Sequence, residues 1–373
     1  MSDRKFWIAF NRVKGIGPAK LRALLDHFGD LESAWRATRI DLAEAGLDKR
    51  AIESLEAARK GINLDQLESN VLRANARMIC WDDDDYPKRL REIDNAPPVL
   101  YVRGNLIEKD NWAVAIVGTR RATSYGKEVT RELATTLAAS GVTIVSGLAR
   151  GIDAVAHVAA LEAGGRTLAV LGSGLDILYP AEHHTLAEKI IAHGALISDY
   201  PLGTPPDANN FPPRNRIISG LSLGAVIVEA GEESGALITA DFAMEQGREV
   251  FAVPGSVFNR NSRGPNRLIQ NGAKLITSAD DVLEELNLRM ASHHAEAREQ
   301  LSLLDSADDA ERKILSQLSA EPLHADELSV AMSLPIATIS SMLAMIELKG
   351  MVRQVGGMTY VAAREARAVY KVE

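Results

Sequence analysis

The chain has 373 residues, of which 46% are hydrophobic and 25% charged, so it can form two or three domains with a sizeable core. Its net charge of −8 argues against a protein coated in basic charge but leaves open a local basic groove for nucleic acid. A single cysteine excludes an intramolecular disulfide framework, and the lack of a roughly 18-residue apolar run or a secretory signal core predicts a cytoplasmic protein with no membrane partner.

Residues 1–72 are predicted to form a small helical domain. Two short helices, at 6–13 and around 21–28, flank the sequence Lys14-Gly15-Ile16-Gly17-Pro18. Gly-apolar-Gly between two helices resembles a helix-hairpin-helix (SAM-like) module, in which the glycines let backbone N–H groups approach a phosphate. The alternative is a helical module that only packs on the next domain, and the sequence leaves both open.

Residues 73–288 show a regular alternation of strands and helices. Strands at 76–81 and 97–104 are expected to extend a sheet whose other strands are predicted at 113–117, 142–145, 167–171, 195–198, 225–228 and 249–253. Helices are predicted between them at 127–140, 154–163, 181–193, 215–221 and 237–246. This alternation predicts an α/β fold with a parallel, doubly wound sheet.

Glycines follow most of these strands and are expected to crowd one edge of the sheet, where α/β folds bind ligands. The first turn, Gly118-Thr119-Arg120-Arg121, has one glycine where a dinucleotide site needs G-x-G-x-x-G, and Ser146 stands where such a site needs an acid. P-loop and hydrolase-elbow motifs are absent, and the acidic run 82–85 is predicted to be a solvated turn. We therefore expect no catalytic residue, no cofactor and no metal.

Basic side chains gather in loops near the same edge. The densest group is the segment 211–216, FPPRNR, whose arginines are predicted in the first turn of a helix, an unfavourable place unless an anion pairs with them. An aromatic ring beside arginines is typical of grooves for single-stranded nucleic acid. The alternative is that Arg214 and Arg216 pair internally, for example with Asp153 or Glu229, and that Phe211 caps the core.

Two further side chains allow two interpretations each. His157 is predicted one helical turn after Asp153, which favours a structural pair over a catalytic dyad. Ser234 begins a predicted helix after an acidic turn, so it either caps that helix or holds an anion.

Residues 86–277 resemble the DNA-processing protein A (DprA/Smf) family. The resemblance rests on eight ordered motifs: Tyr86-Pro87 with Pro97-Pro98-Val99-Leu100-Tyr101, Gly118-Thr119-Arg120, Tyr125-Gly126, Ser146 to Asp153 (SGLARGID) with His157, Gly172 to Asp176 (GSGLD) with Tyr179-Pro180, Phe211 to Arg216, Ser234 to Thr239 (SGALIT) and Pro254-Gly255.

The resemblance implies an extended Rossmann-like core that forms a homodimer, binds single-stranded DNA without sequence preference and loads a RecA-type recombinase, in natural transformation and recombination. By motif position it places DNA contacts at Arg120, Phe211, Arg214 and Arg216. Where family members often carry a basic residue before Phe211, this chain has Ala208-Asn209-Asn210, so one phosphate contact is expected to be missing or moved. The full set of predicted DNA-binding residues is Gly118, Thr119, Arg120, Arg121, Lys127, Gly147, Arg150, Phe211, Arg214, Asn215, Arg216, Ser234, Arg263 and Lys274.

The C-terminal part is predicted to comprise a polar linker, 289–308, and a winged-helix domain, 309–373. Helices are expected at 309–318, 325–331 and 335–348, followed by a hairpin of 351–355 and 358–361. From 281 to 373 the chain has nine basic and fifteen acidic residues, which favours contact with protein or regulation over DNA reading.

The main alternative function is a phosphoribohydrolase-like enzyme that acts on nucleoside monophosphates, with Glu229 or Asp153 as its carboxylate. Such enzymes resemble P-G-G-x-G-T-x-x-E at the phosphate turn. The corresponding stretch here, residues 231–237 (GEESGAL), lacks that pattern, so we favour the DNA-binding function.

Overall fold

The computed structural model describes residues 4–287, 314, 318, 323–332, 334–348, 352–356 and 358–362. The chain divides into two compact units, Met1–Leu288 and Arg289–Glu373, which we describe separately. The boundary predicted at residue 72 lies inside the first unit, because the N-terminal helices share one hydrophobic cluster with the central sheet. The predicted linker and most of the predicted helix 309–318 lie outside the described residues.

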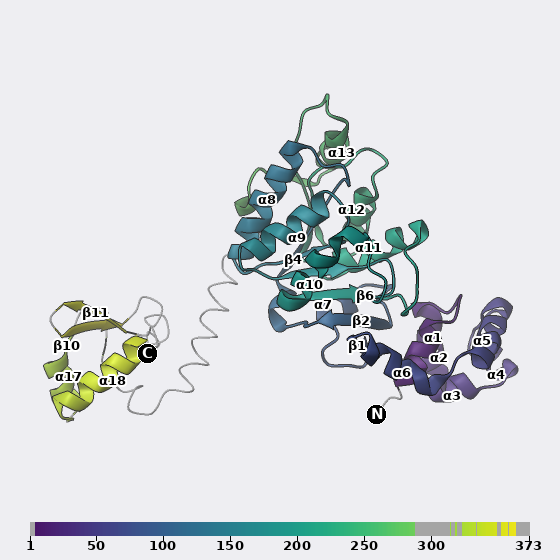
Figure 1. Cartoon of the computed structure of the whole chain (residues 1–373), viewed down its shortest axis with the longest axis horizontal. Coiled ribbons are helices and arrows are strands. Elements are labelled where there is room, and N and C mark those ends of the chain that lie inside the picture. The colour runs from purple at the N-terminus through teal and green to yellow at the C-terminus, as the bar shows by residue number, and fades with distance from the viewer. Residues whose placement is uncertain are drawn as a thin grey trace. The chain divides into compact units, whose positions relative to one another are not determined.

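Within residues 4–287, nine strands form one sheet in the order β1-β2-β6-β5-β4-β3-β7-β8-β9 (Figure 1). The strands from β6 to β9 in this order are parallel, whereas β2 pairs antiparallel with β1 and β6. The doubly wound parallel sheet with an extension at one edge is thus confirmed. The strands are β1 (Arg77–Cys80), β2 (Val99–Gly104), β3 (Ala113–Val117), β4 (Thr143–Ser146), β5 (Thr167–Val170), β6 (Ala195–Ser198), β7 (Gly224–Ile227), β8 (Glu249–Ala252) and β9 (Lys274–Leu275).

Helices cover both faces of this sheet (Figure 1). The chain winds outward from β3 to β6 through one set of helices and returns from β7 to β9 through another, and right-handed crossovers in opposite directions lie on opposite faces. The first set is α8 (Ser124–Ala139), α9 (Ile152–Glu162) and α10 (His184–His193), with α14 (Ala279–Glu285) packed on α8. The second set is α11 (Phe211–Gly220), α12 (Gly235–Glu245) and α13 (Arg263–Gln270), with α7 (Lys88–Arg91) packed on α11.

Two helices next to the arginine-rich edge begin earlier than the sequence pattern predicts. Helix α8 begins at Ser124 because the Thr123 hydroxyl accepts a hydrogen bond from Gly126 N (3.1 Å), which caps the first turn. Helix α11 begins at Phe211, so its two prolines occupy the first turn, where the missing N–H groups cost nothing. Consequently the arginines of α11 lie one turn deeper than predicted.

The N-terminal part of the first unit is helical, as predicted. Gly15, with φ +85°, lies in the turn between α1 and α2, but the Lys20 ammonium beside it already donates to the Gly15 carbonyl (2.9 Å) and pairs with Asp48 (2.5 Å). DNA contact at this turn therefore stays a prediction. The helices are α1 (Arg4–Asn11), α2 (Pro18–Phe28), α3 (Leu31–Arg36), α4 (Arg39–Glu44), α5 (Lys49–Gly61) and α6 (Leu64–Arg73).

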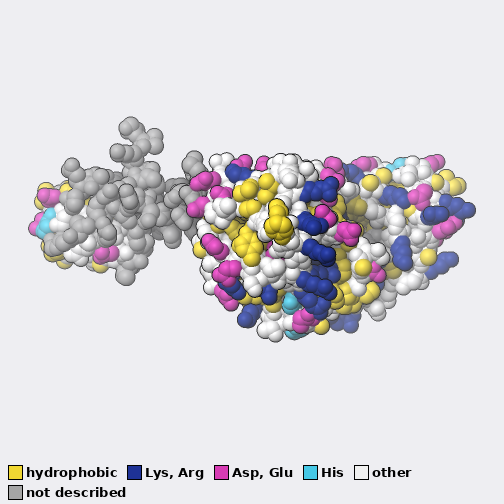
Figure 2. All heavy atoms as spheres, turned by 90° about the horizontal axis from the view of Figure 1, so that it is seen from above, with side chains coloured by type: hydrophobic (Ala, Val, Ile, Leu, Met, Phe, Trp, Pro, Cys, Tyr) yellow, Lys and Arg dark blue, Asp and Glu magenta, His cyan; other side chains and the backbone are white. Residues whose placement is uncertain are grey.

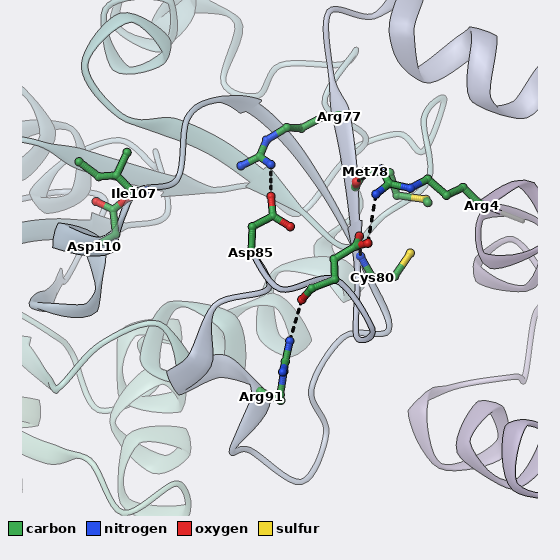
Figure 3. Close-up of polar contacts among 9 residues, drawn as sticks. Arg4, Arg77, Met78, Cys80, Asp85, Arg91, Ile107 and Asp110 are labelled. Carbon is green, nitrogen blue, oxygen red and sulfur yellow. Dashed lines mark hydrogen bonds and ion pairs between the residues drawn. The ribbon is translucent and has the colours of Figure 1, made fainter. Parts of the chain in front are cut away.

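The acidic run 82–85 anchors these helices to the sheet. Arg4 on α1 donates to the Met78 carbonyl on β1 (3.1 Å) and pairs with Asp83 (3.0 Å), while Arg77 pairs with Asp85 (Figure 3). The run is therefore engaged by arginines from two elements, rather than being only the solvated turn that we predicted.

The second unit has the elements of a winged helix, which confirms that prediction. Helices α17 (Ala325–Met332) and α18 (Ile336–Leu348) pack against a sheet of order β10-β12-β11, formed by β10 (Leu323–His324), β11 (Val352–Gly356) and β12 (Thr359–Ala362). In the described part of the chain no single helix is long and apolar enough to cross a membrane; by length and composition alone, α17 and the start of α18 pass that test together, with a 114° bend between them.

His157 on α9 is buried, but its predicted pairing with Asp153 is wrong. Its Nδ1 lies 2.6 Å from Thr167 Oγ1, and that hydroxyl donates to the Ile144 carbonyl (2.7 Å), so it accepts from His157 Nδ1–H. Nε2 then carries no proton, and it has no partner within the described residues. Burial lowers the pKa of His157 to about 3, so the ring is neutral in the folded protein.

We therefore expect His157 to make the first unit acid-sensitive. Below its ordinary pKa of about 6.5 the unfolded chain binds a proton that the folded chain does not, so the free energy of unfolding should fall by up to about 1.4 kcal/mol per pH unit as the pH drops. All four tryptophans lie in this unit, so urea unfolding followed by tryptophan fluorescence at about pH 7.5 and about pH 5.5 measures the slope. His157→Asn should have a shallower slope, and an unchanged slope contradicts this account.

Candidate nucleic-acid interface

The turns after β3 and β7 lie side by side at the carboxyl edge of the sheet. Thr119 N donates to the Glu229 carbonyl (2.6 Å), and Val228 N donates to the Val117 carbonyl (3.2 Å). The winding direction reverses between these strands, and ligands of open α/β sheets bind at such a point. A pocket of about 780 Å³ opens here, and its lining includes Gly118, Thr119, Arg120, Arg121, Phe211, Arg214, Asn215 and Ser234.

Arg120 and Arg121 lie in the turn after β3, and both side chains are exposed. The Arg120 guanidinium carbon lies 5.3 Å from the centre of the Phe211 ring, which is within cation–π range. Among the residues that the structure describes, no carboxylate forms an ion pair with either arginine. Two uncompensated cations therefore line an open pocket, as an anion-binding site requires.

The Phe211 ring that contacts Arg120 is itself held by neighbouring residues. It is partly buried, lies 5.7 Å from the ring of Tyr179 and packs against Gly172, where an added Cβ would lie 2.8 Å from it. Only glycine at position 172 leaves room for this ring. The predicted stacking of a base on Phe211 stays a prediction, because the contacts present in the structure are with Arg120, Tyr179 and Arg214.

Arg214 lies beneath this layer and is buried, with 4% of its surface exposed. It donates to the carbonyls of Gly147 (3.0 Å) and Val170, while Asp153 accepts from the N–H groups of Gly147 (3.1 Å) and Ala149 (3.3 Å). Burial lowers the pKa of Arg214 to about 10, against the opposing effect of Asp153, so it stays charged at neutral pH. Burial likewise raises the pKa of Asp153, and Arg214 opposes that rise.

Gly147 is the position that permits this arrangement. A Cβ there would lie 2.6 Å from a guanidinium nitrogen of Arg214 and 2.8 Å from an Asp153 oxygen. Arg214 and Asp153 thus meet at Gly147 and affect each other's pKa, but the described residues show no ion pair between them, so the predicted internal pairing of these two is not found as a direct contact. Arg214 is buried at the floor of the pocket, and its predicted DNA contact remains a prediction.

Glu229 holds the turn after β3 in place. This buried carboxylate accepts hydrogen bonds from Thr123 N (2.9 Å) and the Thr123 hydroxyl (2.6 Å). It packs against Gly126, where a Cβ would lie 2.4 Å from one of its oxygens. The side chain thus fixes the start of α8, directly after the two exposed arginines.

Arg216 and Arg150 are both paired. The Arg216 guanidinium lies 2.6 Å from Asp199, with both side chains largely buried, and Arg216 is not among the residues that line the pocket. The alternative of internal pairing therefore holds for Arg216, with Asp199 as the acid rather than either of the examples that we named, Asp153 and Glu229. Arg150 pairs with Glu182 and lines a smaller hollow beside Arg120.

Besides Arg150 and Arg216, three more predicted basic residues lie outside the pocket lining. Lys127 is exposed on α8, Arg263 lies 3.9 Å from Glu232, and Lys274 pairs with Glu285. The lining also contains two residues with local structural bonds: Asn215 donates to the Gly235 carbonyl (3.1 Å), and the Ser234 hydroxyl accepts from Ala236 N (3.4 Å), which makes it the predicted cap.

Sequence reasoning missed Asn261 as a pocket residue. Its side chain donates to the Arg121 carbonyl (3.1 Å), and its own carbonyl accepts from Ala230 N (2.7 Å), so it ties both turns to a third loop. Asn261 carries no charge and lies in a stretch without helix or strand periodicity, so no pattern marked it.

Two family models match this chain. The family model described as DNA recombination-mediator protein A matches residues 77–287, and that of the DprA winged helix domain matches residues 298–358. Protein Smf of Synechocystis sp. is 38% identical over 96% of this chain and 98% of its own length. DNA processing protein DprA of Bacillus subtilis is 49% identical over 54% of this chain and 68% of its own length.

Two solved structures are also similar. The X-ray structure of DNA processing protein A from Streptococcus pneumoniae has a TM-score of 0.66 and 35% identity, covering 76% of this chain and 98% of that one. The Helicobacter pylori DNA processing protein A, described for its unique single-stranded DNA binding mode, has a TM-score of 0.51 and 31% identity, covering 57% of this chain and 95% of that one.

The two arginines on either side of Phe211 should differ in what they do for stability. Arg214→Met removes the donor of the Gly147 and Val170 carbonyls and leaves the buried Asp153 carboxylate without the nearby cation, so it should lower the free energy of unfolding by about 3–5 kcal/mol. Arg120→Ala removes an exposed side chain and should change it by no more than about 0.5 kcal/mol. Urea unfolding followed by tryptophan fluorescence measures both, and equal stabilities would contradict a structural function for the buried Arg214.

Proposed function

Because the chain belongs to the DNA recombination-mediator protein A family, we propose that it binds single-stranded DNA without sequence preference and loads a RecA-type recombinase on it. It would do so in the cytoplasm, in recombination and in DNA uptake by natural transformation. The observation that carries the DNA-binding part is the pair of exposed arginines, Arg120 and Arg121, without carboxylate partners in the described residues, at an open pocket on the switch point of the sheet.

The shape of the site favours a polymer over a small nucleotide. Figure 2 shows a row of Lys and Arg side chains that crosses one face of the first unit. Arg150, Arg120 and Arg121 line two adjoining hollows, so successive phosphates of one strand can meet successive cations. Contacts of this kind are with the DNA backbone and give no preference for sequence.

Aromatic side chains at the site favour a single strand over a duplex. Tyr179 is 38% exposed beside Phe211, and both line the pocket. An unpaired strand can turn the faces of its bases toward such rings, whereas a duplex keeps those faces in its own stack. The single-stranded DNA binding described for the Helicobacter pylori relative supports the same choice.

We propose a binding role without catalysis. A nucleotide hydrolase at this site would use Glu229 or Asp153. Glu229 is buried and engaged by Thr123, and Asp153 is buried and engaged by two backbone N–H groups beside Arg214. These contacts support a structural function for each carboxylate.

We further propose that the protein acts as a homodimer through its Rossmann-like unit. Strand β9 forms one edge of the sheet and exposes 45% of Leu275, so this edge offers backbone groups and apolar surface to a second copy.

The acidic balance of residues 281–373 supports contact of the winged-helix unit with protein, and the recombinase partner rests on the family alone.

Arg120→Ala should weaken binding to single-stranded oligonucleotides of any sequence by roughly ten-fold, because one charge-assisted phosphate contact is lost. The slope of log affinity against log salt should become shallower by about 0.7. Fluorescence anisotropy at several salt concentrations measures both quantities.

The matched control is Arg131→Ala, which removes an exposed arginine of α8 that pairs with Glu128 and does not line the pocket. It should bind as the unaltered protein does. Unchanged binding in both Arg120→Ala and Arg121→Ala would overturn the site assignment, and a failure of the unaltered protein to bind would overturn the proposed function.

A further inference from the structure

The loop between β8 and α13 holds a phenylalanine in solvent. Phe258 is 93% exposed, and its neighbour Val257 is 71% exposed. The loop is well fixed: Gly255 and Asn266 exchange hydrogen bonds (3.2 and 2.9 Å), and Phe258 N donates to the Ser256 hydroxyl (3.3 Å). A loop tied at its base therefore presents an exposed aromatic ring.

This loop continues the wall of the pocket. Asn261, three residues after Phe258, lines the pocket and donates to the carbonyl of Arg121 (3.1 Å). The start of α13 packs equally closely on the turn after β7, because Gly264 N donates to the Ala230 carbonyl (2.9 Å) and a Cβ at Gly264 would lie 2.6 Å from that oxygen. A strand that leaves the pocket past Arg121 therefore meets this loop next.

All charged residues near Phe258 in the sequence are basic. Residues 254–275 contain Arg260, Arg263, Arg267 and Lys274 and no acidic residue, in a protein whose net charge is −8. The three arginines are exposed, and the nearest acid paired with them, Glu232, lies at 3.9 Å from Arg263. An apolar protein partner would have to desolvate these cations, whereas a polyanion with aromatic bases satisfies both the cations and the ring.

We propose that Phe258 is a second stacking platform of the single-stranded DNA site, on which a base lies after the strand has passed Arg121, while Arg260 and Arg263 contact the phosphates on either side. The inference rests on the proposed function and extends its site beyond the pocket. Stacking on a ring is tolerant of sequence, so the platform preserves binding without sequence preference.

The test compares Phe258→Ala and Phe258→Trp in the full chain, by fluorescence anisotropy on two probes of about 20 nucleotides, a length beyond the roughly 4–16 nucleotides of one binding domain. One probe is oligothymidylate, and the other is an abasic strand with the same phosphates and no bases. Phe258→Ala should bind oligothymidylate at least about five-fold more weakly and bind the abasic strand normally. Phe258→Trp should bind both normally.

Val257→Ala is the matched control, since it removes an exposed aliphatic side chain from the same loop, and it should leave both affinities unchanged. Unaltered oligothymidylate binding by Phe258→Ala would overturn the inference, as would an equal loss on both probes. A change in molecular mass by light scattering with unchanged DNA affinity would overturn it in favour of a contact between copies. If the unaltered protein does not bind oligothymidylate, the proposed function itself fails.

Discussion

The contact between Arg214 and the carboxyl ends of β4 and β5 is the constraint on which the rest of the site depends. The buried guanidinium joins α11 to the Gly147 and Val170 carbonyls, and Asp153 offsets its charge. Phe211, one turn earlier on the same helix, is held above it at 5.9 Å, and Arg120 lies on Phe211 at 5.3 Å. A buried guanidinium, a ring and an exposed cation thus form successive layers, so the outermost charge is positioned from the core.

A second buried carboxylate, Glu229, positions the turn after β3, which carries the two exposed arginines. Glu229, at the end of β7, binds Thr123 and so fixes the start of α8 directly after Arg120 and Arg121. The two acids that a hydrolase would have used therefore hold the turns after β4 and β3, through Asp153 and Glu229 respectively. This explains why acidic residues lie at the centre of a site that we propose binds a polyanion: their charges are engaged inside, and unpaired arginines lie outside.

The sequence predicted the doubly wound parallel sheet, because alternating buried strands and helices leave a strong pattern, and its ordered motifs predicted the family. It also brought Gly118, Arg120, Phe211 and Ser234 to one edge. It could not separate exposed arginines from paired ones, because the sequence alone does not show which acid lies beside an arginine in the fold. In the structure Arg216 lies 2.6 Å from Asp199, whereas Arg120 forms no ion pair within the described residues. Sequence reasoning missed helix α13, strand β9 and the pocket residue Asn261. A two-residue strand has no periodic pattern, and neither does the hydrogen bond from the uncharged Asn261 side chain to the Arg121 carbonyl.

The central claim is that single-stranded DNA occupies the switch-point pocket. Hydrogen–deuterium exchange of the full chain, with and without saturating oligothymidylate, tests it most directly, since it reports on each turn separately. The account predicts slower amide exchange in residues 118–124 and 231–236 when DNA is bound, with no change across the antiparallel strands β1 and β2. Unchanged exchange in both turns under saturating DNA would contradict it.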